Sequence, residues 1–121
     1  METFEFGFEK KLKEYLGSFN FNKIKVSYDF VLDVGALDLT ISSTTNTDNS
    51  LKICVYPTIE GRRLIKIDNF KERVTLTSRE VFERIVRVIE AKFKGKIKWK
   101  RKKVENHMSI REKGFIIIDE N

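Results

Sequence analysis

The apolar residues of this chain recur with two different periods. From Phe4 to Phe19 they fall three to four positions apart with charged residues between them, which predicts an amphipathic helix over 4–19. From Ile24 to Leu32 every second residue is apolar, and such strict alternation predicts a strand with one buried face. The chain therefore begins with a helix and continues as a strand.

Further short strands follow the first. Alternation predicts a second strand at 37–41, a third that begins at Leu51 and ends at Pro57, and one or two more within 64–77. The polar stretch "SSTTNTDNS" (42–50) between two of these strands is typical of a loop. Short strands at this spacing favour an antiparallel arrangement.

A second helix is predicted at about 78–93. The preceding "TSRE" has the form of a capping box, in which Thr77 and Glu80 satisfy each other's backbone N–H groups. An apolar stripe follows at helical spacing, and Gly95 ends the pattern. The segments "KIKWKRKKV" and "FIIID" then predict a C-terminal β-hairpin, with "ENH" and "REKG" as turns.

This order of elements predicts an α+β fold. A single domain over 1–121 is expected, with an antiparallel-rich sheet of about five to six strands and the helices against one face. Forty per cent of the residues are hydrophobic, which is enough for an ordinary core.

The formal charge of +6 is concentrated in one segment. "KFKGKIKWKRKK" (92–103) carries eight cations and no acid, so the other residues together are slightly acidic. Strand alternation places Lys96, Lys98 and Lys100 on one face, and Ile97 with Trp99 on the other. This pattern predicts that Trp99 packs in the core, with base stacking as the alternative.

An uncompensated run of lysines suits a polyanion, because each phosphate contact releases condensed counterions. We therefore expect a protein that binds the backbone of DNA or RNA, largely without sequence specificity. The predicted contact residues are Lys94, Lys96, Lys98, Lys100, Arg101, Lys102 and Lys103, with Arg62, Arg63, Arg84 and Arg87 as weaker candidates.

Two other interpretations of the basic segment stay open. Edge strands carry lysine to prevent aggregation, and edge protection could be the whole explanation of the segment. The same segment could also dock an acidic or nucleic-acid-binding partner protein, which would make the chain a small inhibitor or adaptor. A homodimer whose sheet continues across protomers would favour the adaptor hypothesis.

Catalytic chemistry finds little support in the sequence. His107 is the only histidine, the single Cys54 has no histidine near it in sequence, and no glycine-rich phosphate loop is present. Asp29, Asp33 and Asp38 are interpreted as solvated strand carboxylates. The sequence thus predicts no enzyme, no metal and no cofactor.

One resemblance, by contrast, favours an enzyme. The element order and the phrase "GFEKKLKEYL" resemble the PD-(D/E)xK nucleases, including the archaeal junction resolvases. The resemblance implies that Glu9 and Asp38 would be metal ligands. The third strand departs from the family pattern, because Cys54 and Tyr56 stand where a glutamate and a lysine would be expected. A degenerate nuclease fold is therefore the minor alternative.

The remaining features concern location. A lone cysteine is typical of a reducing compartment, and the chain has no run of eighteen apolar residues. We expect a cytoplasmic protein that does not enter membranes. Its lysine- and glutamate-rich composition leans towards thermophilic proteins.

Overall fold

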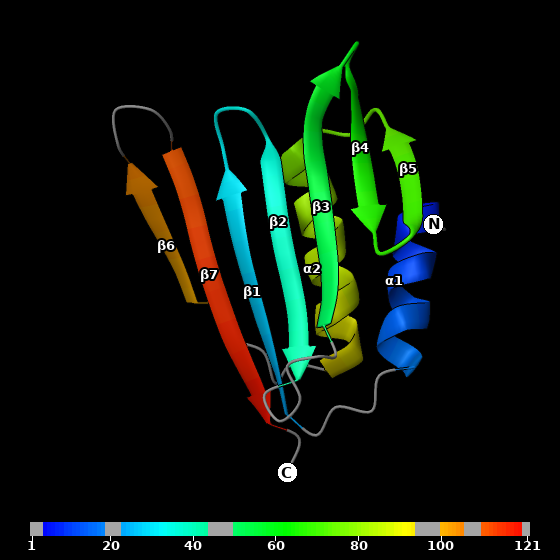
Figure 1. The fold of residues 1–121 in the computed structure, drawn as a ribbon, viewed down its shortest axis with the longest axis vertical. Helices are drawn as coiled ribbons and strands as arrows, with labels where there is room; N and C mark the ends of the chain where they lie inside the picture. The colour runs from blue at the N-terminus through cyan, green and yellow to red at the C-terminus, as the bar shows by residue number, and fades with distance from the viewer. Residues whose placement is uncertain (1–3, 19–22, 44–49, 94–99, 106–109, 120–121) are drawn as a thin grey trace.

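A computed structural model of the chain describes residues 4–18, 23–43, 50–93, 100–105 and 110–119 (Figure 1). In chain order the elements are α1 (Gly7–Ser18), β1 (Lys23–Val31), β2 (Ala36–Ser43), β3 (Ser50–Ile59), β4 (Arg62–Ile67), β5 (Phe70–Val74), α2 (Ser78–Phe93), β6 (Lys100–Glu105) and β7 (Ile110–Asp119). Within these described residues the strands form one seven-stranded antiparallel sheet, and the predicted α+β fold is confirmed.

The strand order of the sheet is β5-β4-β3-β2-β1-β7-β6. The C-terminal strands thus return to the first strand, and β7 pairs with β1 from Lys23↔Asp119 to Val31↔Arg111. The predicted C-terminal hairpin is confirmed, since β6 runs antiparallel to β7. β6 has β7 as its neighbour on one side only, which makes it an edge strand.

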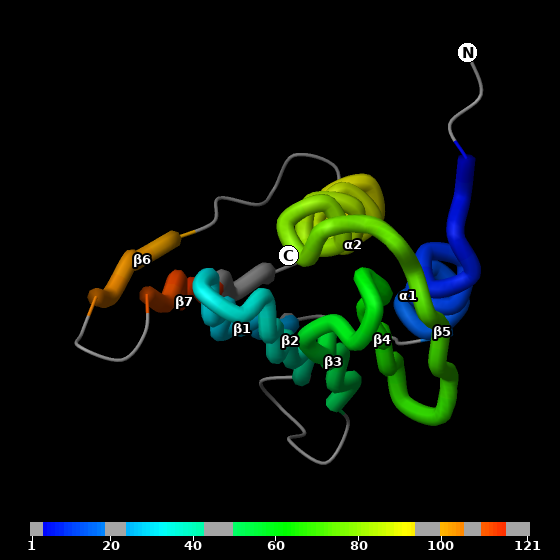
Figure 2. Tube along the Cα trace, turned by 90° about the horizontal axis from the view of Figure 1, so that it is seen from above, coloured from blue at the N-terminus to red at the C-terminus, as the bar shows by residue number. Residues whose placement is uncertain are grey.

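Both helices lie on the same face of the sheet (Figure 2). α1 contacts β4 and β5, while α2 contacts α1 and β2. No described helix covers the other face, which we call the open face. Antiparallel sheets commonly have this arrangement, with one face packed on the core and the other in water.

The alternation of β1 shows why the sheet packs this way. Ile24, Val26, Tyr28 and Phe30 are buried towards the helices, whereas Lys25 between them is exposed. The helices contribute apolar stripes to the same core, through Phe8, Leu12 and Leu16 of α1 and Val81, Phe82, Ile85, Val86, Val88, Ile89 and Phe93 of α2. One apolar layer between sheet and helices therefore holds the fold together.

The start of α2 follows the predicted capping box. The Glu80 backbone N–H donates to Thr77 Oγ1 at 3.1 Å, and the Thr77 N–H donates to Glu80 Oε1 at 3.2 Å. These bonds hold the pKa of Glu80 below its usual value, mainly through the backbone N–H of Thr77. The helix spans Ser78–Phe93, as predicted from the sequence.

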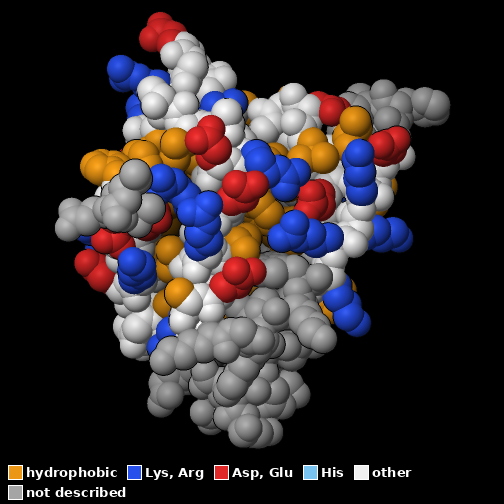
Figure 3. All heavy atoms as spheres, turned by 180° about the vertical axis from the view of Figure 1, so that it is seen from behind, with side chains coloured by type: hydrophobic (Ala, Val, Ile, Leu, Met, Phe, Trp, Pro, Cys, Tyr) orange, Lys and Arg blue, Asp and Glu red, His pale blue; other side chains and the backbone are white. Residues whose placement is uncertain are grey.

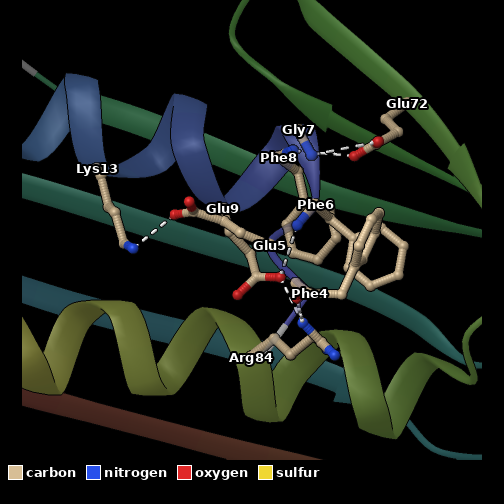
Figure 4. A network of polar contacts seen from close by, with 9 residues as sticks. All are labelled: Phe4, Glu5, Phe6, Gly7, Phe8, Glu9, Lys13, Glu72 and Arg84. Carbon is tan, nitrogen blue, oxygen red and sulfur yellow. Dashed lines mark hydrogen bonds and ion pairs between the residues drawn. The ribbon is translucent and has the colours of Figure 1, made fainter. Parts of the chain in front are cut away.

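α1 starts at Gly7, three residues later than predicted, because a carboxylate from β5 caps it. Glu72 accepts the backbone N–H of Phe8 at 2.9 Å and that of Gly7 at 3.3 Å (Figure 4). A Cβ at Gly7 would lie only 3.1 Å from the Phe70 ring, so glycine lets the helix end approach β5 closely. A carboxylate at this position also complements the positive end of the helix dipole.

Three details of the strand prediction need correction. β3 continues past Pro57 to Ile59, because a register shift after Tyr56 removes the need for a ladder hydrogen bond at the proline. The segment "REKG", predicted as a turn, lies inside β7. The sheet has seven strands rather than five to six, because 62–74 forms two separate strands.

Neither helix in the described ranges is long and apolar enough to cross a bilayer.

Candidate nucleic-acid interface

The basic segment predicted at 92–103 is described only in part. Lys94, Lys96 and Lys98 lie outside the described residues, as does Trp99, so the predicted lysine face of 96–100 and the orientation of the tryptophan fall there too. The described cations of β6 are all exposed: Lys100, Arg101, Lys102 and Lys103.

The side chains of β6 alternate between the two faces of the sheet. Arg101 opposes Gly114, which in turn opposes the buried Tyr28, so Arg101 and Lys103 lie on the helix side. Lys100 and Lys102 consequently lie on the open face. The basic segment does not present its described charge on one surface.

On the helix side, the cations of β6 lie beside carboxylates. Arg101 Nε is 3.8 Å from Glu112 Oε1, and Lys103 Nζ is 3.4 Å from Glu105 Oε1. Arg79 Nη2 forms a second ion pair with Glu112, 3.3 Å from its Oε2. A phosphate approaching from this side would compete with these acids.

Three of the four weaker candidates belong to the helix side. Arg63 donates to Ser78 Oγ at 2.5 Å and to the Leu76 carbonyl at 3.0 Å, so it ties β4 to the start of α2. Arg84 donates to Glu9 Oε1 at 2.6 Å, and its guanidinium lies 4.8 Å from the centre of the Phe6 ring (Figure 4). These two arginines have structural partners.

Arg62 and Arg87 are exposed but lie apart from each other in the fold. Arg62 begins β4, next to the turn at Glu60 and Gly61, and alternation places it on the open face with Lys66. Arg87 lines a groove of about 240 Å³ between α2 and β6, together with Arg101. The structure does not bring the four weaker candidates into one site.

The main excess of positive charge lies on the open face. Among the described strand residues, register and alternation place ten cations there and only two carboxylates, Asp29 and Asp38. The ten come from six of the seven described strands: Lys25, Lys52, Arg62, Lys66, Lys71, Arg73, Lys100, Lys102, Arg111 and Lys113. Three of them were predicted contact residues, Arg62, Lys100 and Lys102, and the other seven were not.

Most of these open-face cations lack a partner acid. Arg111 is 3.4 Å from Asp29, but none of the other nine forms an ion pair with another described residue. Lys102 directly opposes Lys113, and Lys66 directly opposes Lys71. Like charges in directly opposed positions destabilise a sheet, by about 0.2–1 kcal/mol per pair.

The helix side offers a contrast within the same molecule. Figure 3 shows basic and acidic side chains interspersed over it. Besides the pairs already described, Lys11 lies 3.4 Å from Glu14, and Lys13 lies 2.5 Å from Glu5. The cations on this side are largely neutralised, whereas those on the open face are not.

The carboxylates of the nuclease resemblance do not meet. Glu9 lies on α1, in contact with Arg84 of α2, while Asp38 lies on the open face beside Cys54. The sheet separates them, so they cannot bind the same ion. No group of three or more His, Cys, Asp or Glu side chains in the described ranges is positioned to hold a metal.

The other candidate carboxylates have protein partners. Asp33 Oδ2 accepts the Ile110 backbone N–H at 2.9 Å, and Asp29 accepts Arg111. The Cys54 thiol is half-buried, and its pKa is raised by burial and then by its hydrogen bond with Asp38, which disfavours a nucleophilic thiolate. His107 lies outside the described residues.

Comparison with protein families, with curated proteins and with solved structures finds no match to this chain.

Proposed function

We propose that this protein binds the phosphate backbone of nucleic acid, largely without sequence specificity, through the open face of its sheet. The observation that carries the proposal is the excess of ten cations over two carboxylates among the described residues of that face. Nucleic acid is a polyanion, and binding is driven by release of its condensed counterions when lysine or arginine replaces them.

The shape of the face supports a long, thin ligand. Six spacings of about 4.8 Å between seven strands give a width of roughly 29 Å. Cations occur at both edges, on β5 and β6, and also at β1 near the centre. A nucleic-acid backbone that runs across the strands would contact several of these cations in succession.

The distribution of the charge argues against edge protection as the whole explanation. Protection from edge-to-edge aggregation requires lysines only on the outermost strands. Lys25 and Lys52 lie on the interior strands β1 and β3, where no edge needs protecting. The repulsion between Lys102 and Lys113 is a stability cost that a bound polyanion would offset.

We propose a binding role rather than a catalytic one. The separation of Glu9 from Asp38 across the sheet supports this, because a nuclease site requires carboxylates that share a metal ion. The proposal concerns phosphates alone and specifies neither DNA nor RNA, since backbone contacts carry no sequence information.

The alternation of β6 provides a matched test. Lys100→Ser with Lys102→Ser removes two charges from the open face, and Arg101→Ser with Lys103→Ser removes two charges from the helix side of the same strand. Both double variants have the same net charge and the same edge position. Affinity for a duplex and for a single-stranded oligonucleotide is measured from low to moderate salt.

We expect the open-face variant to lose affinity and to flatten the log–log salt slope. Two lost contacts correspond to a change of roughly 1.4 on a single strand and 1.8 on a duplex. The helix-side variant should stay close to the parent. Equal behaviour of the two variants would refute the assignment to the open face. Absence of binding by the parent, with capture of an acidic protein instead, would favour the adaptor hypothesis.

A further inference from the structure

One aromatic ring is exposed in the middle of the lysines on the open face. Phe115 of β7 is 47% exposed, and its directly opposed neighbours are Ser27 of β1 and Lys100 of β6. A single exposed apolar side chain is ordinary on a protein surface. The feature that distinguishes Phe115 is the set of lysines around it.

Four lysines surround this ring. Lys25 Nζ lies 5.8 Å from the ring centre, within the range of a cation–π contact. Lys100 opposes Phe115, Lys113 lies two residues before it on the same face, and Lys102 opposes Lys113. Together with Phe115, Ser27, Tyr28, Arg101 and Gly114 they line a groove of about 380 Å³.

The groove has the two features that single-stranded nucleic acid requires. A flat ring can stack an unpaired base, and flanking cations can bind the phosphates on either side of that base. A duplex does not offer an unpaired base, since its bases are stacked on one another inside the helix. The ring would therefore contribute to binding a single strand and contribute little to binding a duplex.

We infer that Phe115 is a stacking platform for one unpaired base, and that Lys25, Lys100, Lys102 and Lys113 bind the adjoining phosphates. This inference rests on the proposed function and narrows it to single-stranded DNA or RNA. Stacking accepts any base, because every base has a π face, so the lack of sequence specificity is retained.

The ring itself is tested by two substitutions that differ in aromaticity. Phe115→Leu keeps an apolar side chain but removes the π face. Phe115→Trp keeps a π face and enlarges it. Tyr56→Ala is the control, since Tyr56 is a similarly exposed aromatic (44%) on the open face, in β3, three strands away. Thermal melting of each variant establishes that it is folded.

Three ligands separate stacking from charge. They are a short oligothymidine, a strand of the same length and charge made of abasic sites, and a duplex. Loss of one base–aromatic stack corresponds to about 5- to 150-fold weaker binding. We expect Phe115→Leu to lose this much for oligothymidine and almost nothing for the abasic strand or the duplex. Phe115→Trp and Tyr56→Ala should bind oligothymidine like the parent.

The outcomes distinguish this inference from the proposed function. If the parent binds oligothymidine and the abasic strand equally, and Phe115→Leu changes neither, then the stacking platform is wrong while phosphate binding stands. An equal loss in Tyr56→Ala would also overturn the assignment to Phe115. If the parent binds none of the three ligands at moderate salt, the proposed function itself fails.

Discussion

Gly114→Ala should destabilise the fold strongly, because Gly114 lies where two strands and a buried ring converge. A Cβ at this position would overlap the Tyr28 ring and would lie 2.7 Å from the carbonyl oxygen of Lys100. The Tyr28 ring cannot move freely. Tyr28 is buried, packs against Phe82 with ring centres 4.8 Å apart, and donates to Glu112 Oε1 at 2.9 Å.

The magnitude follows from these contacts. Overpacking a filled site costs about 1–3 kcal/mol. If the Tyr28 ring shifts and loses its bond to the Glu112 carboxylate, roughly 1.5–3 kcal/mol is added, as for hydrogen bonds to charged groups. We therefore expect a loss of about 3–5 kcal/mol in the free energy of unfolding. For a domain of this size that corresponds to a decrease in Tm of about 10 °C or more.

The assay is urea denaturation followed by circular dichroism, with Gly17→Ala as the matched control. Gly17 lies in the last turn of α1 and has no atom within 4 Å of its Cβ position, so the same substitution there should be neutral or stabilising by up to about 1 kcal/mol. A Gly114→Ala variant as stable as the parent, or a similar shift in both variants, would refute the packing argument.

Three further predictions concern the helix cap and the charge on the open face. Thr77→Ala should lower the free energy of unfolding by about 0.5–2 kcal/mol in urea titration. Folding lowers the pKa of Glu80, so the ionised carboxylate stabilises the fold fully above the usual glutamate pKa, and this stabilisation is lost as pH falls through the lower, folded-state value. Glu80→Gln should therefore make the free energy of unfolding less dependent on pH in acid. An unchanged acid profile would contradict this. Lys102→Glu places a carboxylate opposite Lys113 and should raise stability by about 0.2–1 kcal/mol while weakening oligonucleotide binding; lower stability or unchanged affinity would contradict the repulsion argument.

Local signals predicted the helices well. The bounds of α2 follow from the capping box at Thr77 and from an apolar stripe that ends at Phe93, and both are properties of neighbouring residues. The start of α1 could not be predicted in the same way. Its cap comes from Glu72, which is 65 positions from Gly7 in sequence, and no local pattern reports such a contact.

The candidate site was found only in part, for a similar reason. The run of adjacent cations predicted a binding site at β6, but alternation distributes these side chains over both faces of the sheet. Lys25 and Lys52 reach the open face from strands that contain no run of adjacent charges. Alternation predicts which residues of a strand share a face, but strand order decides which strands lie side by side, and that order depends on long-range pairing. The misplaced "REKG" turn has a separate cause, since Gly114 serves packing rather than reversal of the chain.

The proposed binding face and the packed face of the sheet are linked at this glycine. Phe115 follows Gly114 directly, so the ring and the glycine lie on opposite faces of β7. Lys100 provides both the carbonyl that approaches Gly114 and the side chain that opposes Phe115. Any larger residue at 114 pushes β6 away from β7, and it thereby changes the spacing between Phe115 and the lysines of β6. Among the described strands β6 has only β7 beside it, so the close packing over Gly114 determines the geometry of the open face at this edge.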